Sequence, residues 1–384
     1  MKWRGRTALW LPPLAFALAC DGGPAPTTSG AAPVAAPVTA EAQAVESKTS
    51  GPTDANADTD ADPSAPPVRK DGTIYADAEL MGTRVSLNVW LPPDKTAAEA
   101  GAAMQAALDA MSRIEDMMSE WQADSELSRI SAAAGGEAVA VSPELVEILA
   151  RARVIAAETQ GAFDPTFHGV GQLWSFAPGA TPPPAAAIAE KLPLVNYRNL
   201  HVDREAQVVR LAKAGMMLGL GAIAKGYAVD RASAVLVARG LIHHVVEAGG
   251  DTYASGTKNG KPWAVGIQAP DKRGVVGVLP TSGRAVVTSG NYQRYFEHDG
   301  VRYAHILDPR TGWPITAERS PRSVTVVAAN ATDADAYATA IAVMGVQTGM
   351  AFVEANDALE AVVIDGTDKV HISSGLRDQL VVPQ

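Results

Sequence analysis

The stretch VTVVAANATDADAYATAIAVMG, residues 324–345, joins a strand-like run to a small, apolar helical run. The first six residues are almost wholly apolar and of strand length, and the later apolar residues recur at helical spacing. The helix begins with Thr332, Asp333 and Asp335, and it carries Thr339 one turn further on. One interpretation is a capping box, in which Thr332 and the acid three residues later bind the free N–H groups of the first turn. That interpretation does not explain Thr339.

A second interpretation makes Asp335 and Thr339 metal ligands. Residues four apart on a helix share one face, so the carboxylate and the hydroxyl point the same way. A few oxygen donors suit Mg²⁺, which keeps coordination positions for substrate phosphates. The helix is therefore predicted to hold a metal-bound pyrophosphate, and a second element must then bind phosphate.

The glycine-rich turn in GLGAIAKGYAVD, residues 219–230, is the candidate for that element. It follows a strand-like segment at 208–222 and opens a helix expected at 223–240. Such a turn presents backbone N–H groups and the positive end of a helix dipole to an anion, and Lys225 adds a charge. The spacing matches neither the Walker motif nor the dinucleotide fingerprint. The alternative is that the glycines only permit tight packing.

His305 lies in YAHILDPRTGWPI, between a strand and a rigid turn. A histidine fixed at the end of a strand is a suitable general base, because its pKa lies near neutral pH. The alternative is a structural histidine whose ring nitrogens are satisfied within the fold.

Helices and strands are mixed along residues 71–384 without strict βαβ alternation, which favours an α+β fold. This length suits one large domain or two closely packed halves. Residues 73–91 alternate as a strand pair or one long strand, and helices are expected at 97–119 and 143–160. Ser142 is the expected cap of the second helix, with Pro143 at its first position.

The N-terminus resembles a secretory signal. Residues 1–19 combine a positive start with a short apolar stretch, and residues 17–20 (ALAC) resemble the lipobox in which Cys20 is acylated. The alternative is ordinary signal cleavage with an incidental cysteine. Residues 20–70 are poor in large apolar side chains and are expected to form a disordered tether. No other segment reaches the roughly 18 apolar residues of a spanning helix, so anchoring is expected through lipid.

Charge and cysteine content restrict the partners and the cross-links. The formal charge of −10 argues against a nucleic acid partner, although a local basic pocket could still bind phosphate. Cys20 is the only cysteine, so an intrachain disulfide is excluded.

Eight segments resemble, in order, the motifs of the ApbE family of FAD:protein FMN transferases. They are MGT (81–83), MSEWQADSELSRIS (118–131), GAFDPT (161–166), GAIAKGYAVD (221–230), EAGGD (247–251), TSGNYQRYF (288–296), HILDPRTGWPI (305–315) and DADAYATAIAVMG (333–345). The resemblance implies one large mixed α/β domain of the ApbE-like, T-fold-like type over residues 71–384.

The resemblance also implies a reaction. A threonine hydroxyl of an acceptor protein attacks the FMN-side phosphorus of FAD with Mg²⁺ on the pyrophosphate, and AMP leaves. His305 is the implied base, and the metal ligands are Asp335, Thr339 and the carbonyl of Ala222. The residues implied to line the FAD site are Met81, Trp121, Ala162, Phe163, Asp164, Lys225 and Leu307. The implied acceptor is a membrane-associated electron-transfer subunit, and the implied location is the periplasmic face of the bacterial inner membrane, with a lipid anchor.

Two positions depart from the family pattern. Gly219 stands where family members usually have an Asp that contacts FAD, so one cofactor contact is expected to be unfilled. Ala338 replaces a second Asp that some members have near the metal. Two other activities fit the same motifs: Mg²⁺-dependent hydrolysis of FAD to FMN and AMP, and non-catalytic binding of FAD by a lipoprotein.

Overall fold

The computed structural model describes residues 65–270, 274–291, 294–316 and 320–382. Cys20, the predicted signal peptide and most of the predicted tether lie outside these residues. The last residues assigned to the tether contact the domain: Arg69 donates its N–H to the carbonyl of Thr73 and lies over the ring of Tyr75. Within the described residues, no helix is long and apolar enough to cross a membrane.

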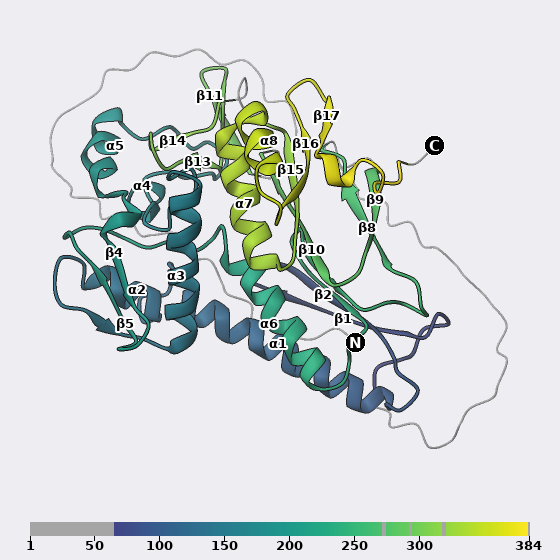
Figure 1. Ribbon diagram of the computed structural model, residues 1–384. Helices are drawn as coiled ribbons and strands as arrows, with labels where there is room; N and C mark the ends of the chain where they lie inside the picture. The colour runs from purple at the N-terminus through teal and green to yellow at the C-terminus, as the bar shows by residue number, and fades with distance from the viewer. Residues whose placement is uncertain (1–64, 271–273, 292–293, 317–319, 383–384) are drawn as a thin grey trace, which may run out of the picture. The chain divides into compact units, whose positions relative to one another are not determined.

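An antiparallel sheet of eight strands forms the centre of the fold (Figure 1). Its order is β1 (Thr73–Leu80), β2 (Thr83–Trp90), β6 (His244–Ala248), β7 (Asp251–Ser255), β10 (Arg284–Gly290), β15 (Ser323–Ala328), β16 (Glu360–Ile364) and β17 (Val370–Ile372). Residues 73–91 are thus a strand pair, joined by a turn in which Met81 and Gly82 have positive φ angles.

Strand β15 is almost wholly apolar because it is buried on both faces of the sheet. Along β15, Val324 and Val326 belong to one hydrophobic cluster, whereas Val327 belongs to another on the opposite face. Successive side chains of a strand alternate between faces, so a strand covered on both sides is apolar throughout.

Three long helices cover one face of this sheet, as Figure 1 shows. They are α1 (Ala97–Met118), α6 (Ala224–Ala238) and α7 (Ala331–Met344), and α8 (Val346–Glu354) follows α7. The opposite face is covered by the hairpin of β8 (Trp263–Gln268) and β9 (Val275–Thr281), with Trp263 and Leu279 in the second cluster. The expected helix at 97–119 is confirmed.

Smaller elements surround this core. The helices are α2 (Glu126–Ala132), α3 (Pro143–Glu158), α4 (His168–Gly171) and α5 (Ala185–Lys191), with single 3₁₀ turns at Leu192–Leu194, Tyr197–Asn199 and Ser374–Leu376. A three-stranded sheet has the order β3 (Val139–Ala140), β5 (Val208–Leu211), β4 (Leu200–Asp203), and two hairpins pair β11 (Tyr295–His298) with β12 (Val301–Ala304) and β13 (Leu307–Asp308) with β14 (Trp313–Pro314). Ser142 caps α3 and Pro143 opens it, as predicted.

The strand expected at 208–222 is wrong beyond Leu211. The following backbone groups bind partners outside any sheet: Leu218 N–H donates to Ser131 Oγ at 3.0 Å, and Gly219 N–H donates to the Pro165 carbonyl at 2.9 Å. This segment is therefore a fixed loop that leads into α6. The described residues form one compact unit, so the α+β prediction of a single domain is confirmed.

Candidate active site

Close contact between α6 and α7 places Lys225 beside Asp335. Gly226, in the first turn of α6, donates its N–H to Asp335 Oδ2 at 3.1 Å. A Cβ on Gly226 would lie 2.9 Å from the Cβ of Asp335 and would overlap the carbonyl oxygen of Ala331. Glycine at position 226 therefore lets the two helices bring their polar groups together.

Lys225, Asp251 and Asp335 form a buried charge cluster. Lys225 Nζ lies 2.8 Å from Asp251 Oδ2 and 3.3 Å from both carboxylate oxygens of Asp335. The carboxylate side chains are 2% and 3% exposed, whereas that of Lys225 is 27% exposed. Burial raises the pKa of Asp251 well above its ordinary value, and the charge of Asp335 adds to the rise. Burial by itself lowers the pKa of Lys225, but the two neighbouring carboxylates raise it by more. The net pKa is therefore raised, and the lysine stays positively charged at neutral pH.

The N-terminus of α7 is not capped by Thr332 and Asp335, the capping box considered in the sequence analysis. Asn330 is the N-cap residue, and its side chain accepts a backbone N–H of the first turn. Asp230 of α6 accepts the N–H and the hydroxyl of Thr332. The capping box of Thr332 and Asp335 is therefore wrong, because the cap lies two residues earlier and Asp335 faces Lys225 instead.

Asp335 and Thr339 lie one turn apart on α7, as their spacing predicted. Thr339 Oγ1 is 3.5 Å from Ser289 Oγ on β10, and Ala222 lies in the turn that precedes α6. No group of three or more His, Cys, Asp or Glu side chains that could hold a metal ion occurs in the described part of the chain. A carboxylate, a hydroxyl and a backbone carbonyl are nevertheless an all-oxygen donor set that fits Mg²⁺ taking its other ligands from phosphates and water.

Segments far apart in the sequence meet around this cluster. A Cβ on Gly249 would lie 2.5 Å from Thr83 Oγ1, so the segments at 247–251 and 81–83 are in contact. Thr288 N–H donates to the carbonyl of Gly250 at 3.1 Å, so the segment that begins at Thr288 also contacts residues 247–251. The strand order β2, β6, β7, β10 produces these contacts, and Asp251 enters the cluster as the first residue of β7.

His305 follows β12 and is half-buried. Its N–H donates to the Arg294 carbonyl at 3.0 Å, and its ring Nδ1 lies 3.1 Å from the same oxygen. The tautomer with a proton on Nδ1 satisfies that carbonyl and leaves Nε2 free to accept a proton. Burial lowers the pKa of His305, and the positive charges of Arg294 and Lys225 act in the same direction.

The remaining residues implied for the FAD site are mostly buried. Ala162, Phe163 and Asp164 lie in the loop after α3, and Leu307 lies in β13. Both oxygens of Asp164 accept backbone N–H groups, from residue 166 at 2.8 Å and from residue 197 at 2.9 Å, so this side chain organises its own loop. Burial raises the pKa of Asp164. By contrast, the Trp121 side chain is 73% exposed.

Glu120 is a residue to which the sequence assigned no role. Its Oε2 accepts the N–H of Leu220 at 3.1 Å, within the glycine-rich turn. A Cβ on Gly219 would lie 3.4 Å from this oxygen. The carboxylate of Glu120 therefore lies beside Gly219, together with the side chains of Phe167 and His168. Burial raises its pKa, against the Leu220 hydrogen bond, which lowers it.

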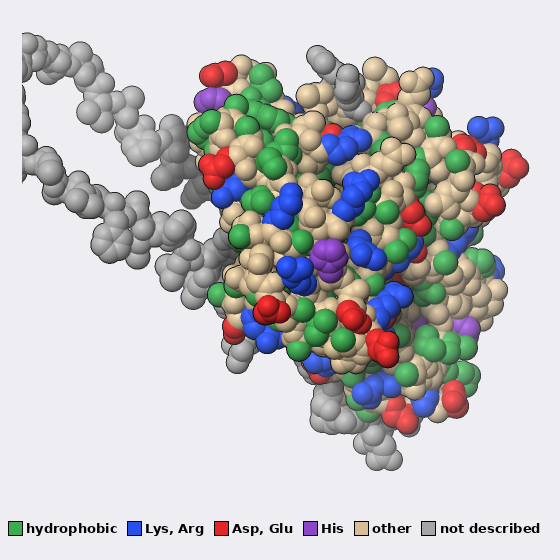
Figure 2. All heavy atoms as spheres, turned by 60° about the vertical axis from the view of Figure 1, so that its left-hand side comes forward, with side chains coloured by type: hydrophobic (Ala, Val, Ile, Leu, Met, Phe, Trp, Pro, Cys, Tyr) green, Lys and Arg blue, Asp and Glu red, His purple; other side chains and the backbone are tan. Residues whose placement is uncertain are grey.

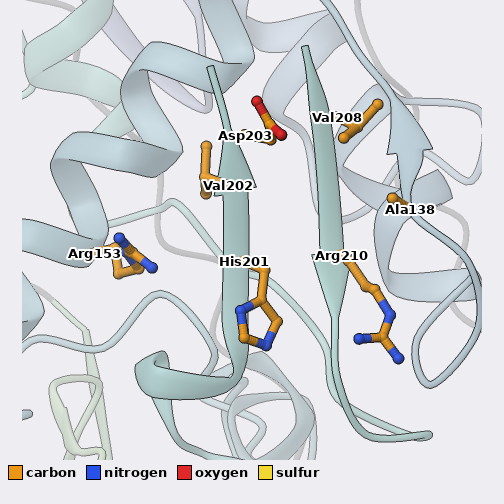
Figure 3. A pocket seen from close by; sticks show the side chains of 7 residues that line it. All are labelled: Ala138, Arg153, His201, Val202, Asp203, Val208 and Arg210. Carbon is orange, nitrogen blue, oxygen red and sulfur yellow. The ribbon is translucent and has the colours of Figure 1, made fainter. Parts of the chain in front are cut away.

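A shallow pocket of about 300 Å³ lies elsewhere, between α3 and the three-stranded sheet. Figure 3 shows His201 and Arg210 on neighbouring strands, with Arg153 nearby on a helix. Lys and Arg side chains gather in the middle of the face that Figure 2 turns forward. None of the residues implied for catalysis or for the FAD site lines this pocket.

Fold and site define an antiparallel α+β domain with a lysine–carboxylate cluster beside a glycine-rich turn. The model of the ApbE family matches residues 81–363. A FAD:protein FMN transferase of Treponema pallidum is 37% identical in an alignment 327 residues long that covers 80% of this chain and 89% of that protein. One of Klebsiella pneumoniae is 31% identical and covers 80% of this chain and 94% of that protein. The chain belongs to the ApbE family.

Solved structures have the same fold. The ApbE protein of Thermotoga maritima matches with a TM-score of 0.73 at 32% identity, over 80% of this chain and 99% of that chain. The flavin transferase ApbE from Vibrio cholerae matches with a TM-score of 0.71 at 29% identity and the same coverage. The expected ApbE-like fold is confirmed.

Proposed function

We propose that this chain transfers FMN from FAD to an acceptor protein. Relatives named FAD:protein FMN transferase match it over 70–80% of its length. The observation that carries the proposal is the cluster of Lys225, Asp251 and Asp335 at the start of α6, together with a His305 imidazole oriented by the Arg294 carbonyl. Transfer at phosphorus requires fixed charges near the phosphates and a base for the attacking hydroxyl.

FAD is the substrate in this proposal, with its pyrophosphate at the first turn of α6. The Lys225 ammonium favours an anion there, whereas the N–H groups of Ile223, Ala224 and Gly226 already bind Leu220 and Asp335. The exposed indole of Trp121 offers a face for stacking on the flavin or the adenine. The other residues proposed to line the site are Met81, Ala162, Phe163, Asp164 and Leu307.

Asp335, Thr339 and the carbonyl of Ala222 are the proposed holders of Mg²⁺. When bound, the ion supplies charge neutralisation at the pyrophosphate oxygens. Lys225 serves the same end from the protein side, because its charge stabilises the phosphate of the departing AMP.

The reaction exchanges one P–O bond for another. The bond between the FMN phosphorus and the AMP oxygen breaks, and a bond from that phosphorus to a threonine oxygen of the acceptor forms. His305 accepts the hydroxyl proton at Nε2, while Nδ1 stays bound to the Arg294 carbonyl, 3.1 Å away. The fixed imidazole is therefore oriented before the acceptor arrives.

The acceptor and the location are further parts of the proposal. The acceptor is a membrane-associated electron-transfer subunit, and the chain is held by a lipid on Cys20 at the periplasmic face of the inner membrane. The support is the ALAC segment at residues 17–20 and Asp21, which follows the cysteine. Labelling with a fatty-acid analogue tests this: wild type should carry label, and Cys20→Ser should not.

The activity is tested by incubating the chain with FAD and Mg²⁺, with and without an acceptor protein. AMP release that needs the acceptor, together with an acceptor mass raised by one FMN, would establish transfer. An acceptor with its target threonine changed to valine should remain unmodified. AMP released without any acceptor would instead show FAD hydrolysis, and bound FAD without AMP would show a flavin carrier.

A further inference from the structure

A carboxylate that the proposed mechanism does not use lies at the glycine-rich turn. The side chain of Glu120 is only 13% exposed, and its Oε2 accepts the N–H of Leu220 at 3.1 Å. Its Oε1 lies 3.7 Å from the position of a Cβ on Gly221. The carboxylate is therefore held against the backbone of the turn that leads to Ala222 and Lys225.

The second oxygen of Glu120 has no hydrogen-bond donor within the described residues. The His168 imidazole is nearby, but its Nδ1 lies 3.9 Å from Oε1, which is too long for a hydrogen bond. Burial lowers the pKa of His168, so the imidazole is neutral near pH 7 and does not neutralise the carboxylate. Oε1 itself is not fully buried, so it is the oxygen of this largely buried carboxylate that a donor from a ligand can reach.

The position of the turn restricts which part of FAD can supply that donor. The proposed pyrophosphate site begins at Ala222, two residues after Leu220. In FAD the groups on either side of the pyrophosphate are the ribose of AMP and the ribityl chain of FMN, and both carry hydroxyl groups. A carboxylate is a suitable acceptor for such groups: in dinucleotide-binding folds an Asp or Glu about 20 residues after the glycine-rich turn binds the ribose 2′-hydroxyl. The exposed Trp121 ring, 5.5 Å from the His168 ring, borders the same place.

We propose that Glu120 accepts a hydrogen bond from a sugar hydroxyl of FAD and so fixes the dinucleotide at the glycine-rich turn. The identity of the ligand rests on the proposed function.

The test is equilibrium binding of FAD to the full chain and its variants, followed by flavin fluorescence without acceptor. Glu120→Ala should raise the Kd for FAD about ten- to a hundredfold, as expected for a lost hydrogen bond to a charged group. Glu120→Gln keeps the volume and an acceptor for Leu220, and it should raise the Kd less. Asp124→Asn, an exposed acid in the same segment, is the matched control and should bind as wild type does. An unchanged Kd in a folded Glu120→Ala variant would overturn the proposal.

Two partial ligands identify the sugar. If Glu120→Ala weakens ADP-ribose but not FMN, the contact is to the ribose, and the reverse result assigns it to the ribityl chain. If neither ligand is weakened, the proposal fails. If the wild-type chain binds FAD but does not modify an acceptor, the proposed transfer is refuted. The FAD affinities of wild type and the Glu120 variants can still be compared. Transfer that survives with an unaltered KM for FAD in Glu120→Ala would refute only the role of Glu120.

Discussion

At the residue scale, the metal interpretation depends on Asp335. Its removal leaves Lys225 paired with Asp251 at 2.8 Å, so no buried charge loses its only partner. We expect Asp335→Ala to reduce AMP release by about a hundredfold or more, while unfolding free energy falls by about 1–3 kcal/mol. Transfer assays and urea unfolding on the same variant measure both. Full activity, or a chain that does not fold, would return Asp335 to a structural role.

Removal of divalent ions provides an independent measurement at the same site. We expect a chelator to abolish transfer by wild type and added Mg²⁺ to restore it, because the oxygen donors of Asp335 and Thr339 suit this ion. Asp335→Ala should gain nothing from added Mg²⁺ at concentrations that restore wild type. Transfer that persists after chelation would contradict the proposed metal dependence.

The pKa of His305 determines how the activity depends on pH. Burial lowers this pKa below the ordinary 6.5, so the imidazole stays neutral and able to accept a proton to below pH 6.5. We expect kcat/KM to remain level as pH falls from 8 through 6.5 and to decline only below it. His305→Asn should lower kcat by about 10²–10⁴ and remove this decline. An acid limb centred above pH 6.5 would exclude His305 as the base.

At the scale of elements, the contact between α6 and α7 makes Gly226 essential. A methyl group at this position would overlap the carbonyl of Ala331 and press on Asp335. We expect Gly226→Ala to cost about 1–3 kcal/mol of unfolding free energy and to abolish transfer by displacing Asp335. Gly169→Ala is the control, because its nearest neighbour would be 3.7 Å away. Normal activity in Gly226→Ala would show that the helices can separate without loss.

Local signals predicted the long helices, and the failures occur where distant contacts decide the structure. Ser142 and Pro143 mark the start of α3 in the sequence and in the fold. The strand expected at 208–222 ends at Leu211, because the later backbone groups bind residues far away in the sequence, such as Glu120, which is 100 positions from Leu220.

The residues of the candidate site also differ in how far the sequence could predict them. Helical spacing placed Asp335 and Thr339 on one helix, and both lie in α7, while their binding of a metal stays a prediction. Asp251 was quoted within a motif but received no role, because its contact with Lys225 depends on the order of strands in the sheet. Glu120 was missed for a similar reason, because its hydrogen bond with Leu220 joins positions that are 100 residues apart.

At the scale of the whole molecule, the domain begins before the predicted residue 71. Arg69 contacts Thr73 and Tyr75, and Asp71 pairs with Lys258 at 2.6 Å. We expect a chain that starts at residue 65 to melt at the same temperature as one that starts at 21. A chain that starts at 72 should melt about 2–4 °C lower. Calorimetry of the three chains is the measurement, and equal melting temperatures would show that residues 65–71 add no stability.

His244 links α6 to the central sheet. It opens β6 and is fully buried; Nε2 lies 2.8 Å from Ser233 Oγ on α6, and Nδ1 lies 2.7 Å from the Leu241 carbonyl. Burial lowers its pKa from 6.5 to about 4. Between these values the unfolded chain binds a proton that the folded chain does not, so stability must fall as pH falls through this window.

This linkage predicts how the stability of the whole domain responds to acid. The contribution of neutral His244 is fully present above pH 6.5, and about 3 kcal/mol of it is lost by pH 4. Urea unfolding of wild type and His244→Asn at pH 7 and pH 4 measures the loss: the variant is less stable at pH 7, and the gap should narrow by that amount in acid. His201→Asn, which changes an exposed histidine, should keep the wild-type dependence. Parallel pH curves for wild type and His244→Asn would mean that His244 can charge within the fold, and that α6 and β6 separate enough to admit water.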